Sequence, residues 1–231
     1  MSKHPRVLVA TGLGVVATLG MPRTIAAQDA RVYVGAAGML STQGSHRQGS
    51  GPSLPTTGAG GTVLGATVEG GTFLTPSVAL GIEVSLPSRF TSMQETDYLR
   101  VFQQESRHRD LVISGVFRGR VGLARRVGLG IVAGGGFVQE STRQRRRDQA
   151  GLLPAYPPVF GPYSAEYSFT RWTVAALAGA DVEIAVTSHV AIVPQMRAHV
   201  VRRSNDPSEP GWALGLGSVV LRPAIGVRGA F

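Results

Sequence analysis

The sequence of 231 residues contains no cysteine, and aromatic residues make up only 6% of it. The lack of cysteine excludes disulfide bonds, thiol chemistry, zinc-thiolate sites and cysteine-linked lipid anchors. Long apolar runs are missing as well, because charged or turn residues interrupt every candidate before it reaches the roughly 18 residues of a transmembrane helix. These absences argue against a small disulfide-stabilised domain and against a helical membrane protein.

The N-terminus has the three parts of a secretory signal peptide. A basic start precedes an apolar stretch over residues 7–21, and Ala26 and Ala27 provide small residues for cleavage. The apolar stretch is too short to anchor the chain in a bilayer. We therefore expect residues 1–27 to be a cleaved signal peptide and residues 28–231 to form one domain, exported into a Gram-negative envelope.

The chain is basic, with 23 Lys and Arg against 14 Asp and Glu and a formal net charge of +9. Cleavage would remove Lys3, Arg6 and Arg23, which leaves every remaining basic residue an arginine. A basic chain can bind nucleic acid. Export makes anionic lipopolysaccharide or a membrane surface the expected electrostatic partner instead, with no nucleic acid.

Polar and apolar residues alternate with period two through most of the expected domain, which predicts strands. In residues 169–186 every charge falls on one face: Arg171, Asp181 and Glu183 alternate with apolar residues such as Trp172. Eight segments of this kind are found, namely residues 31–39, 62–74, 78–86, 111–123, 127–139, 169–186, 190–201 and 214–231.

The connections between these segments alternate strictly between long and short. In order they are residues 41–61, 75–77, 89–110, 124–126, 140–168, 187–189 and 202–213. An outer-membrane barrel has tight turns on its periplasmic side and long loops outside, and an even strand count closes its sheet without an edge. This rhythm places both termini on the short-turn side.

The last predicted strand ends on an aromatic residue, Phe231. This ending, the strand count and the loop rhythm resemble the small eight-stranded OmpA-like and OmpX-like outer-membrane β-barrels. The resemblance implies an all-β fold, an eight-stranded antiparallel up-and-down transmembrane β-barrel, integral in the bacterial outer membrane, monomeric and with periplasmic termini. It also implies contact with outer-membrane lipid and lipopolysaccharide, and that Phe231 is the assembly signal for the barrel assembly machinery. Gly229 departs from the family pattern, which usually has a second aromatic residue there.

Charged residues fall on the face of the strands that would line the barrel interior. We expect them to form a lumen charge network of Glu69, Glu83, Arg118, Arg120, Asp181, Glu183, Arg197 and Arg228. An eight-stranded barrel is only wide enough for its own side chains, so a wide pore is excluded. The network is interpreted as a plug, and an ion or proton path is the alternative.

One pair in this network allows a closer prediction. A tight turn near residues 75–77 places Glu69 almost directly across from Glu83, where like charges need a cation between them or a proton. Arg118 and Arg120 stand about as far from their own turn as Glu83 does from its turn. We predict that at least one of these arginines contacts Glu83.

Two prolines lie inside predicted strands. Pro194 and Pro223 each remove a donor from the hydrogen-bond ladder, in a setting where a bilayer offers no replacement. A bulge or irregular pairing is therefore expected at both positions, and a shifted register is possible.

The long connections carry the one feature that suggests binding. Arg143, Arg145, Arg146 and Arg147 form a basic cluster after residue 139, and Arg107 and Arg109 lie in another long connection. Arginine matches the geometry of phosphate, so the cluster is interpreted as a contact for lipopolysaccharide or another anion. A solvated loop face is the alternative interpretation.

No catalytic site, metal site or cofactor is evident in the sequence. The histidines show no metal-ligand spacing, and Ser188 beside His189 is not a catalytic dyad in an extended chain. The prediction is an outer-membrane barrel with a structural or surface-interaction role that is not an enzyme. The alternatives are a surface adhesin or ligand-binding barrel acting through its external loops, a lipid-modifying outer-membrane enzyme, and a soluble barrel of lipocalin type, which would need an apolar interior.

Overall fold

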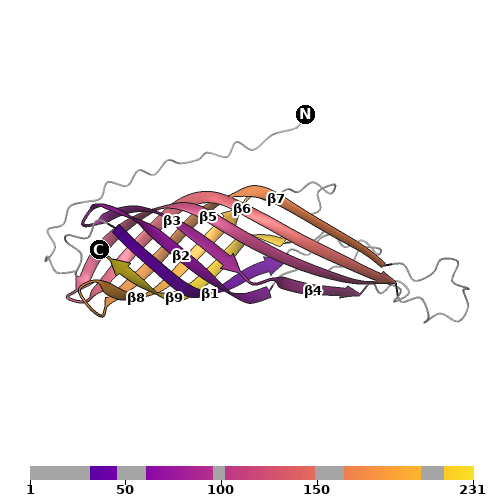
Figure 1. The fold of residues 1–231 in the computed structure, drawn as a ribbon, viewed down its shortest axis with the longest axis horizontal. Coiled ribbons are helices and arrows are strands. Elements are labelled where there is room, and N and C mark those ends of the chain that lie inside the picture. The colour runs from indigo at the N-terminus through magenta and orange to yellow at the C-terminus, as the bar shows by residue number, and fades with distance from the viewer. Residues whose placement is uncertain (1–31, 46–60, 96–101, 149–163, 204–215) are drawn as a thin grey trace, which may run out of the picture.

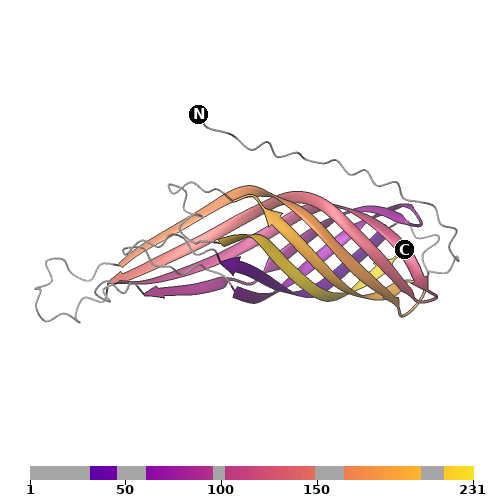
Figure 2. The same cartoon turned by 180° about the vertical axis from the view of Figure 1, so that it is seen from behind.

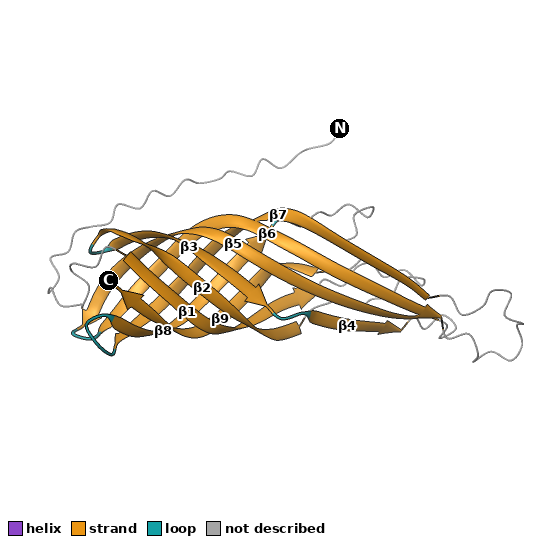
Figure 3. Cartoon of the chain, viewed as in Figure 1, coloured by secondary structure: helices purple, strands orange, loops and turns teal. Residues whose placement is uncertain are grey.

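In the computed structural model, residues 32–45, 61–95, 102–148, 164–203 and 216–231 are described. These residues form strands joined by short turns (Figure 3). The strands are β1 (Val32–Ser45), β2 (Gly61–Thr75), β3 (Val78–Pro87), β4 (Phe90–Glu95), β5 (Phe102–Ala124), β6 (Val127–Asp148), β7 (Ser164–Ala185), β8 (Val190–Val201) and β9 (Leu216–Ala230). No helix among the described residues has the length and apolar character needed to cross a membrane. The predicted signal peptide lies outside the described residues.

The strands form one closed antiparallel ring. Strands β3 and β4 do not pair with each other but lie one after the other along β5, whereas all other neighbours in sequence pair, and β1 pairs with β9. The nine strands among the described residues therefore occupy eight positions around the ring. The N–H of Phe231 donates to the carbonyl of Val32 at 2.9 Å, which extends the closing pair to the last residue. The tilted strands wrap around a common axis (Figures 1 and 2). The predicted fold class, an eight-stranded antiparallel up-and-down barrel, is therefore confirmed as a fold.

The two ends of the barrel differ. The turns after β2, β5 and β7 lie together with the C-terminus at one end, here called the short-turn end (Figure 3). The longest strands, β5, β6 and β7, extend toward the opposite long end (Figure 1). The short turns agree with the sequence prediction to within one or two residues.

Apolar side chains form a belt around the outside of the barrel. On β6 the outward positions from Val127 to Phe137 are all apolar or glycine, and the next outward position is Gln139. On β7 the belt ends at Trp172, which is 56% exposed and pairs in register with Gln139. Because the pleat sends successive residues to opposite faces, the polar residues that alternate with this belt point inward. The barrel is therefore apolar outside and polar inside.

The strands on one side are longer than predicted. Pairing between β5 and β6 continues from the turn to Phe102 and Asp148, and β7 begins at Ser164. Residues 102–110 and 140–148 were thus wrongly assigned to loops. The prediction ended each strand where its apolar alternation ended, but backbone pairing does not require apolar side chains.

Both strand prolines interrupt one ladder without shifting it. The β7–β8 pairing has no partner for Pro194 although the register is the same on both sides of it, and the β1–β9 pairing has the same kind of gap at Pro223. Both prolines stay in register on their other side, between β8 and β9. The expected irregular pairing is therefore found at both positions, and it involves neither a bulge nor a register shift there.

Close strand approach requires glycine on the inner face of β6. A Cβ atom at Gly136 would lie 1.9 Å from the carbonyl oxygen of Ile113, and one at Gly134 would lie 2.1 Å from that of Gly115. These glycines therefore let β6 approach the backbone of β5, which is a structural role.

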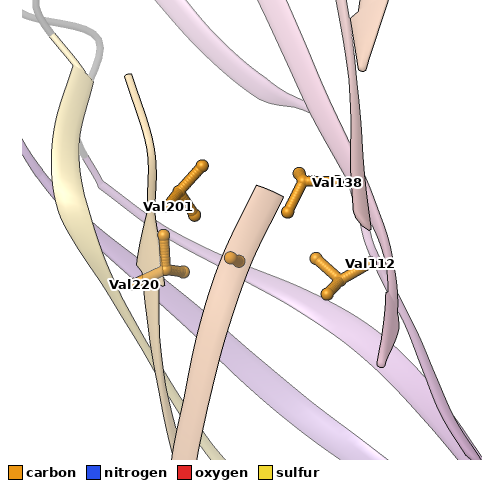
Figure 4. Close-up of a cluster of buried hydrophobic side chains, with 5 residues drawn as sticks. Val112, Val138, Val201 and Val220 are labelled. Carbon is orange, nitrogen blue, oxygen red and sulfur yellow. The ribbon is translucent and has the colours of Figure 1, made fainter. Parts of the chain in front are cut away.

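The barrel interior is layered along its axis. On β5 the inward residues run from Asp110 through Val112 and Val116 to Arg118, so apolar residues separate two charged regions. Figure 4 shows side chains from different strands converging inside the barrel. This apolar layer consists of Val112, Val138, Ala175, Val201 and Val220, and a smaller cluster consists of Val116, Val132 and Leu177.

Candidate functional site

Among the described residues, the charged region nearest the short-turn end brings together four carboxylates and four guanidinium groups. Arg228, only 4% exposed, lies 2.6 Å from Glu69 and 2.9 Å from Asp181, and it also contacts Glu183. Arg118 lies 2.6 Å from Glu69 and 3.0 Å from Asp181. With equal numbers of both signs, the formal charges of the eight residues cancel.

Two further arginines complete this network, which we call the lower network. Arg120 lies 2.8 Å from Glu183, and Arg197 lies 2.9 Å from Glu83 and 2.5 Å from Asp181. The ring of Tyr33 lies under the Arg118 guanidinium, 4.9 Å from its carbon to the ring centroid. The structure thus brings together all eight residues that the sequence assigned to the lumen.

The pairing of Glu69 with Glu83 across the β2–β3 hairpin is confirmed. The predicted partner of Glu83 is wrong, because Arg197 of β8 holds it while Arg118 and Arg120 pair elsewhere. The partner differs from the prediction because neighbouring strands of a barrel are staggered along the barrel axis. The N–H of Arg120 donates to the carbonyl of Ser77, so Arg120 lies level with the β2–β3 turn, and Ser114 is the residue of β5 that faces Glu83.

Small cavities lie beside the lower network. One of about 30 Å³ lies among Phe73, Arg120, Glu183 and Arg228, and one of about 10 Å³ lies beside Glu69 and Gln195. Cavities of this size accommodate single water molecules. The described residues around the lower network therefore fill this part of the lumen.

A second buried charged group, here called the upper group, lies on the long-end side of the apolar layer. The sequence pattern did not predict it. Asp110 on β5 pairs in register with Glu140 on β6, and His108 contacts Asp110 through its Nε2 atom. Arg203 lies 2.9 Å from Glu140 and 3.5 Å from Asp110. The signal was present in the sequence: continuing the β5–β6 hairpin register from its short turn pairs residue 110 with residue 140.

This upper group has the composition of a metal site. One ligand atom from each of His108, Asp110 and Glu140 lies within 4.8 Å of the others. The guanidinium groups of Arg203 and Arg171 already contact these carboxylates. A metal cation would be repelled by these guanidinium groups and would have to displace them. The chemistry of the group therefore fits an internal ion-pair network better than a metal centre.

The arginine cluster of residues 143–147 lies on a strand and not in a loop. Arg143 and Arg145 of β6 are exposed, and the Arg143 side chain lies 2.5 Å from Glu166 of β7. The hydrogen bond from Arg143 lowers the pKa of the Glu166 carboxyl. Arg146 and Arg147 pair in register with Gln104 and Gln103, and their side chains lie outside the described part of the structure.

A groove lies on the outer surface of the barrel beside Arg143. It has a volume of about 330 Å³ and lies where the apolar belt meets the polar long end. Arg89, Arg107 and Arg109 also line it. The structure thus joins arginines that the sequence analysis had placed in separate loops.

Phe231 lies on the outer surface at the short-turn end. Its side chain is 64% exposed, and its backbone forms two hydrogen bonds with Val32 that close the ring. The ring of Phe231 lies against the position where a Cβ atom of Gly229 would be, 3.1 Å away.

Comparison with known proteins finds similarity to solved structures. The chain is similar to Neisserial surface protein A (14% identity, 87% of this chain and 97% of that one, TM-score 0.45) and to the attachment invasion locus protein Ail of Yersinia pestis (8%, 87% and 99%, TM-score 0.43). It is also similar to the outer membrane protein OprG of Pseudomonas aeruginosa (12%, 90% and 99%, TM-score 0.44). No protein-family model and no curated protein matches the chain.

Proposed function

We propose that the chain is an integral outer-membrane β-barrel protein with a structural or surface-interaction role. One observation carries the proposal: a closed ring has a continuous apolar belt outside and paired charges inside. In water such a belt would be an exposed apolar surface far larger than soluble monomers carry. In a bilayer it contacts hydrocarbon, and ring closure satisfies the backbone hydrogen bonds.

Orientation follows from the asymmetry of the two ends. Outer-membrane barrels have short turns on the periplasmic side, so the termini lie in the periplasm and the long end faces outward. Phe231, exposed beside the closing strand pair, is then available as the assembly signal for the barrel assembly machinery.

The interior supports a plugged barrel without a wide pore. The lower network, the apolar layer and the upper group succeed one another along the axis, and each contains fully buried side chains. Buried carboxylates in direct contact with arginines are not arranged as a hydrated path for ions. The same charged interior argues against a soluble lipocalin type, whose ligand cavity would be apolar.

The test is fractionation combined with a gel-shift assay of unheated and boiled protein. We expect the protein in the outer-membrane fraction, and we expect the unheated sample to migrate as a compact band that shifts on boiling. Recovery in the soluble periplasm without a heat-dependent shift would contradict the proposal.

A surface-binding role is the second candidate, supported by the length of the strands at the long end. A barrel strand crosses a bilayer in about 9 to 11 residues, whereas β5, β6 and β7 have 23, 22 and 22 residues. Their outer halves therefore project beyond the apolar belt as a paired sheet. Binding of the purified barrel to candidate surfaces, compared with a variant whose three strands are shortened above the belt, tests this role.

An enzymatic role has weaker support. Ser188 contacts Nδ1 of His189 at 2.8 Å, but the two residues are neighbours in an exposed turn at the short-turn end. A serine nucleophile is activated by a histidine that a third group orients. We therefore propose no reaction for this pair.

A further inference from the structure

The groove on the outer surface arises from a break between β3 and β4. Ser85 pairs with Val112 and Phe90 pairs with His108, so the four residues 86–89 face the three residues 109–111 of β5. The N–H of Ser88 donates to the carbonyl of Leu64 at 2.6 Å, on the side away from β5. This irregularity separates the chain at Arg89 from β5 and opens the wall on its outer side.

The groove is basic, and none of its described lining residues is acidic. They are Leu86, Arg89, Arg107, His108, Arg109, Leu111, Gln139, Ser141, Thr142, Arg143 and Ser168. Two of the four arginines have carboxylate partners, since Arg107 lies 2.7 Å from Glu105 and Arg143 lies 2.5 Å from Glu166. Among the described residues, the buried Nε atom of Arg109 has no hydrogen-bond partner.

The position of the groove at the edge of the apolar belt means that a ligand filling it would also contact apolar side chains. Leu86, 41% exposed, and Leu111 belong to the outward belt, and Gln139 pairs with Trp172 at the upper edge of that belt. A ligand that matches both the basic part and the apolar part of the groove has an anionic, oxygen-rich group next to the arginines and a hydrocarbon chain along the leucines. Arginine donates paired hydrogen bonds to phosphate, which makes phosphate the matching anion.

We propose that this groove is a binding site for the phosphate group of a phosphorylated lipid of the outer leaflet, with lipid A as the source. The proposal rests on the outer-membrane function proposed above and specifies its partner. It also revises the arginine cluster suggested by the sequence: Arg143 is retained, and Arg89, Arg107 and Arg109 join it as described groove residues.

The experiment measures lipid A retained by the folded barrel in neutral detergent, by native mass spectrometry over a lipid A titration. The test variant is R89Q/R109Q, and the control is R125Q/R126Q, which removes the same charge from the exposed turn between β5 and β6. Loss of charge-assisted hydrogen bonds to phosphate predicts that the test variant binds about ten-fold more weakly or worse. The control variant should bind like the unchanged protein.

Two further ligands test whether binding requires both the phosphate group and the lipid. Dephosphorylated lipid A should bind far more weakly than lipid A, and inorganic phosphate should not displace lipid A at millimolar concentration. Equal weakening by both variants, or equal binding of dephosphorylated lipid A, would overturn the proposal, as would displacement by inorganic phosphate. If the double variant does not fold, Arg109→Lys replaces it, and unchanged binding by that variant would overturn the proposal as well.

The gel-shift assay distinguishes failure of the lipid site from failure of the proposed outer-membrane function. A barrel that shows a heat-dependent shift but does not bind lipid A contradicts the lipid site and leaves the outer-membrane function intact. A protein without any heat-dependent shift contradicts the outer-membrane function itself.

Discussion

Arg228 is the side chain on which the lower network depends most. It contacts three carboxylates, Glu69, Asp181 and Glu183, and lies with its guanidinium carbon 5.6 Å from the centroid of the Tyr33 ring. Arg228→Met retains most of the aliphatic stem and removes the charge. The interior is then left with four carboxylates and three guanidinium groups in the lower network.

The size of the effect follows from burial. Removing one partner of a buried ion pair costs about 3 to 5 kcal/mol, because the remaining charge stays buried without compensation. After Arg228→Met, Glu183 retains only Arg120 at 2.8 Å, while Glu69 retains Arg118 at 2.6 Å. We therefore expect the free energy of unfolding of R228M to fall by about 3 kcal/mol or more.

A second substitution tests whether charge balance is the cause. Glu183→Gln in the R228M background restores equal numbers of both signs in the lower network. The double variant should be more stable than the sum of the two single losses predicts, by about 1 to 3 kcal/mol. Arg125→Met, in an exposed turn, is the matched control and should change stability by less than about 0.5 kcal/mol.

The measurement is urea unfolding of each variant in detergent micelles, followed by tryptophan fluorescence and by the fraction of heat-shifting band. A loss below about 1 kcal/mol for R228M would refute the reasoning, since it would be closer to the about 0.5 kcal/mol of a surface substitution than to the about 3 to 5 kcal/mol of a broken buried ion pair. Strict additivity of R228M and E183Q would refute it too, because the charges would then be acting independently.

Three other outcomes are expected. Gly136→Val should prevent formation of the compact band, since a Cβ atom there lies 1.9 Å from a β5 carbonyl, whereas Gly119→Ala, with nothing within 4 Å, should fold normally. In a W212F background, brominated phosphatidylcholine should quench Trp172, which lies at the belt edge and is 56% exposed; no quenching would contradict the membrane position of the belt. Phe231→Ala should lower the amount of barrel assembled in cells several-fold but leave refolding in detergent unchanged, whereas equal loss in both would indicate that the residue is only structural.

Local pattern was sufficient to predict the hairpins. Period-two alternation and the short turns placed Glu69 opposite Glu83, and the same register arithmetic would have paired Asp110 with Glu140. That second pair was missed because the predicted strands ended where the apolar alternation ended. The polar extensions of β5 and β6 remain paired beyond that point, because the backbone ladder does not require apolar side chains.

Contacts across the lumen could not be predicted in this way. Glu83 pairs with Arg197, which is 114 residues away in sequence and on a strand that does not neighbour β3. The choice of partner depends on the stagger that accumulates from strand to strand when a tilted sheet closes into a ring. Arg118 and Arg120 were expected at the level of Glu83, and this stagger places them nearer the short-turn end.

The sequence by itself determined which side chains face outward, where the chain turns, and that a belt of apolar residues alternates with charged ones. It could do so because backbone dihedrals fix the two-residue repeat of a strand, and a tight turn fixes the register of its hairpin. Only the tertiary structure decided which charges meet inside the barrel and that Arg89, Arg107, Arg109 and Arg143 share one groove. Those neighbours come from different strands, and their relative heights are set by ring closure, which no local segment specifies.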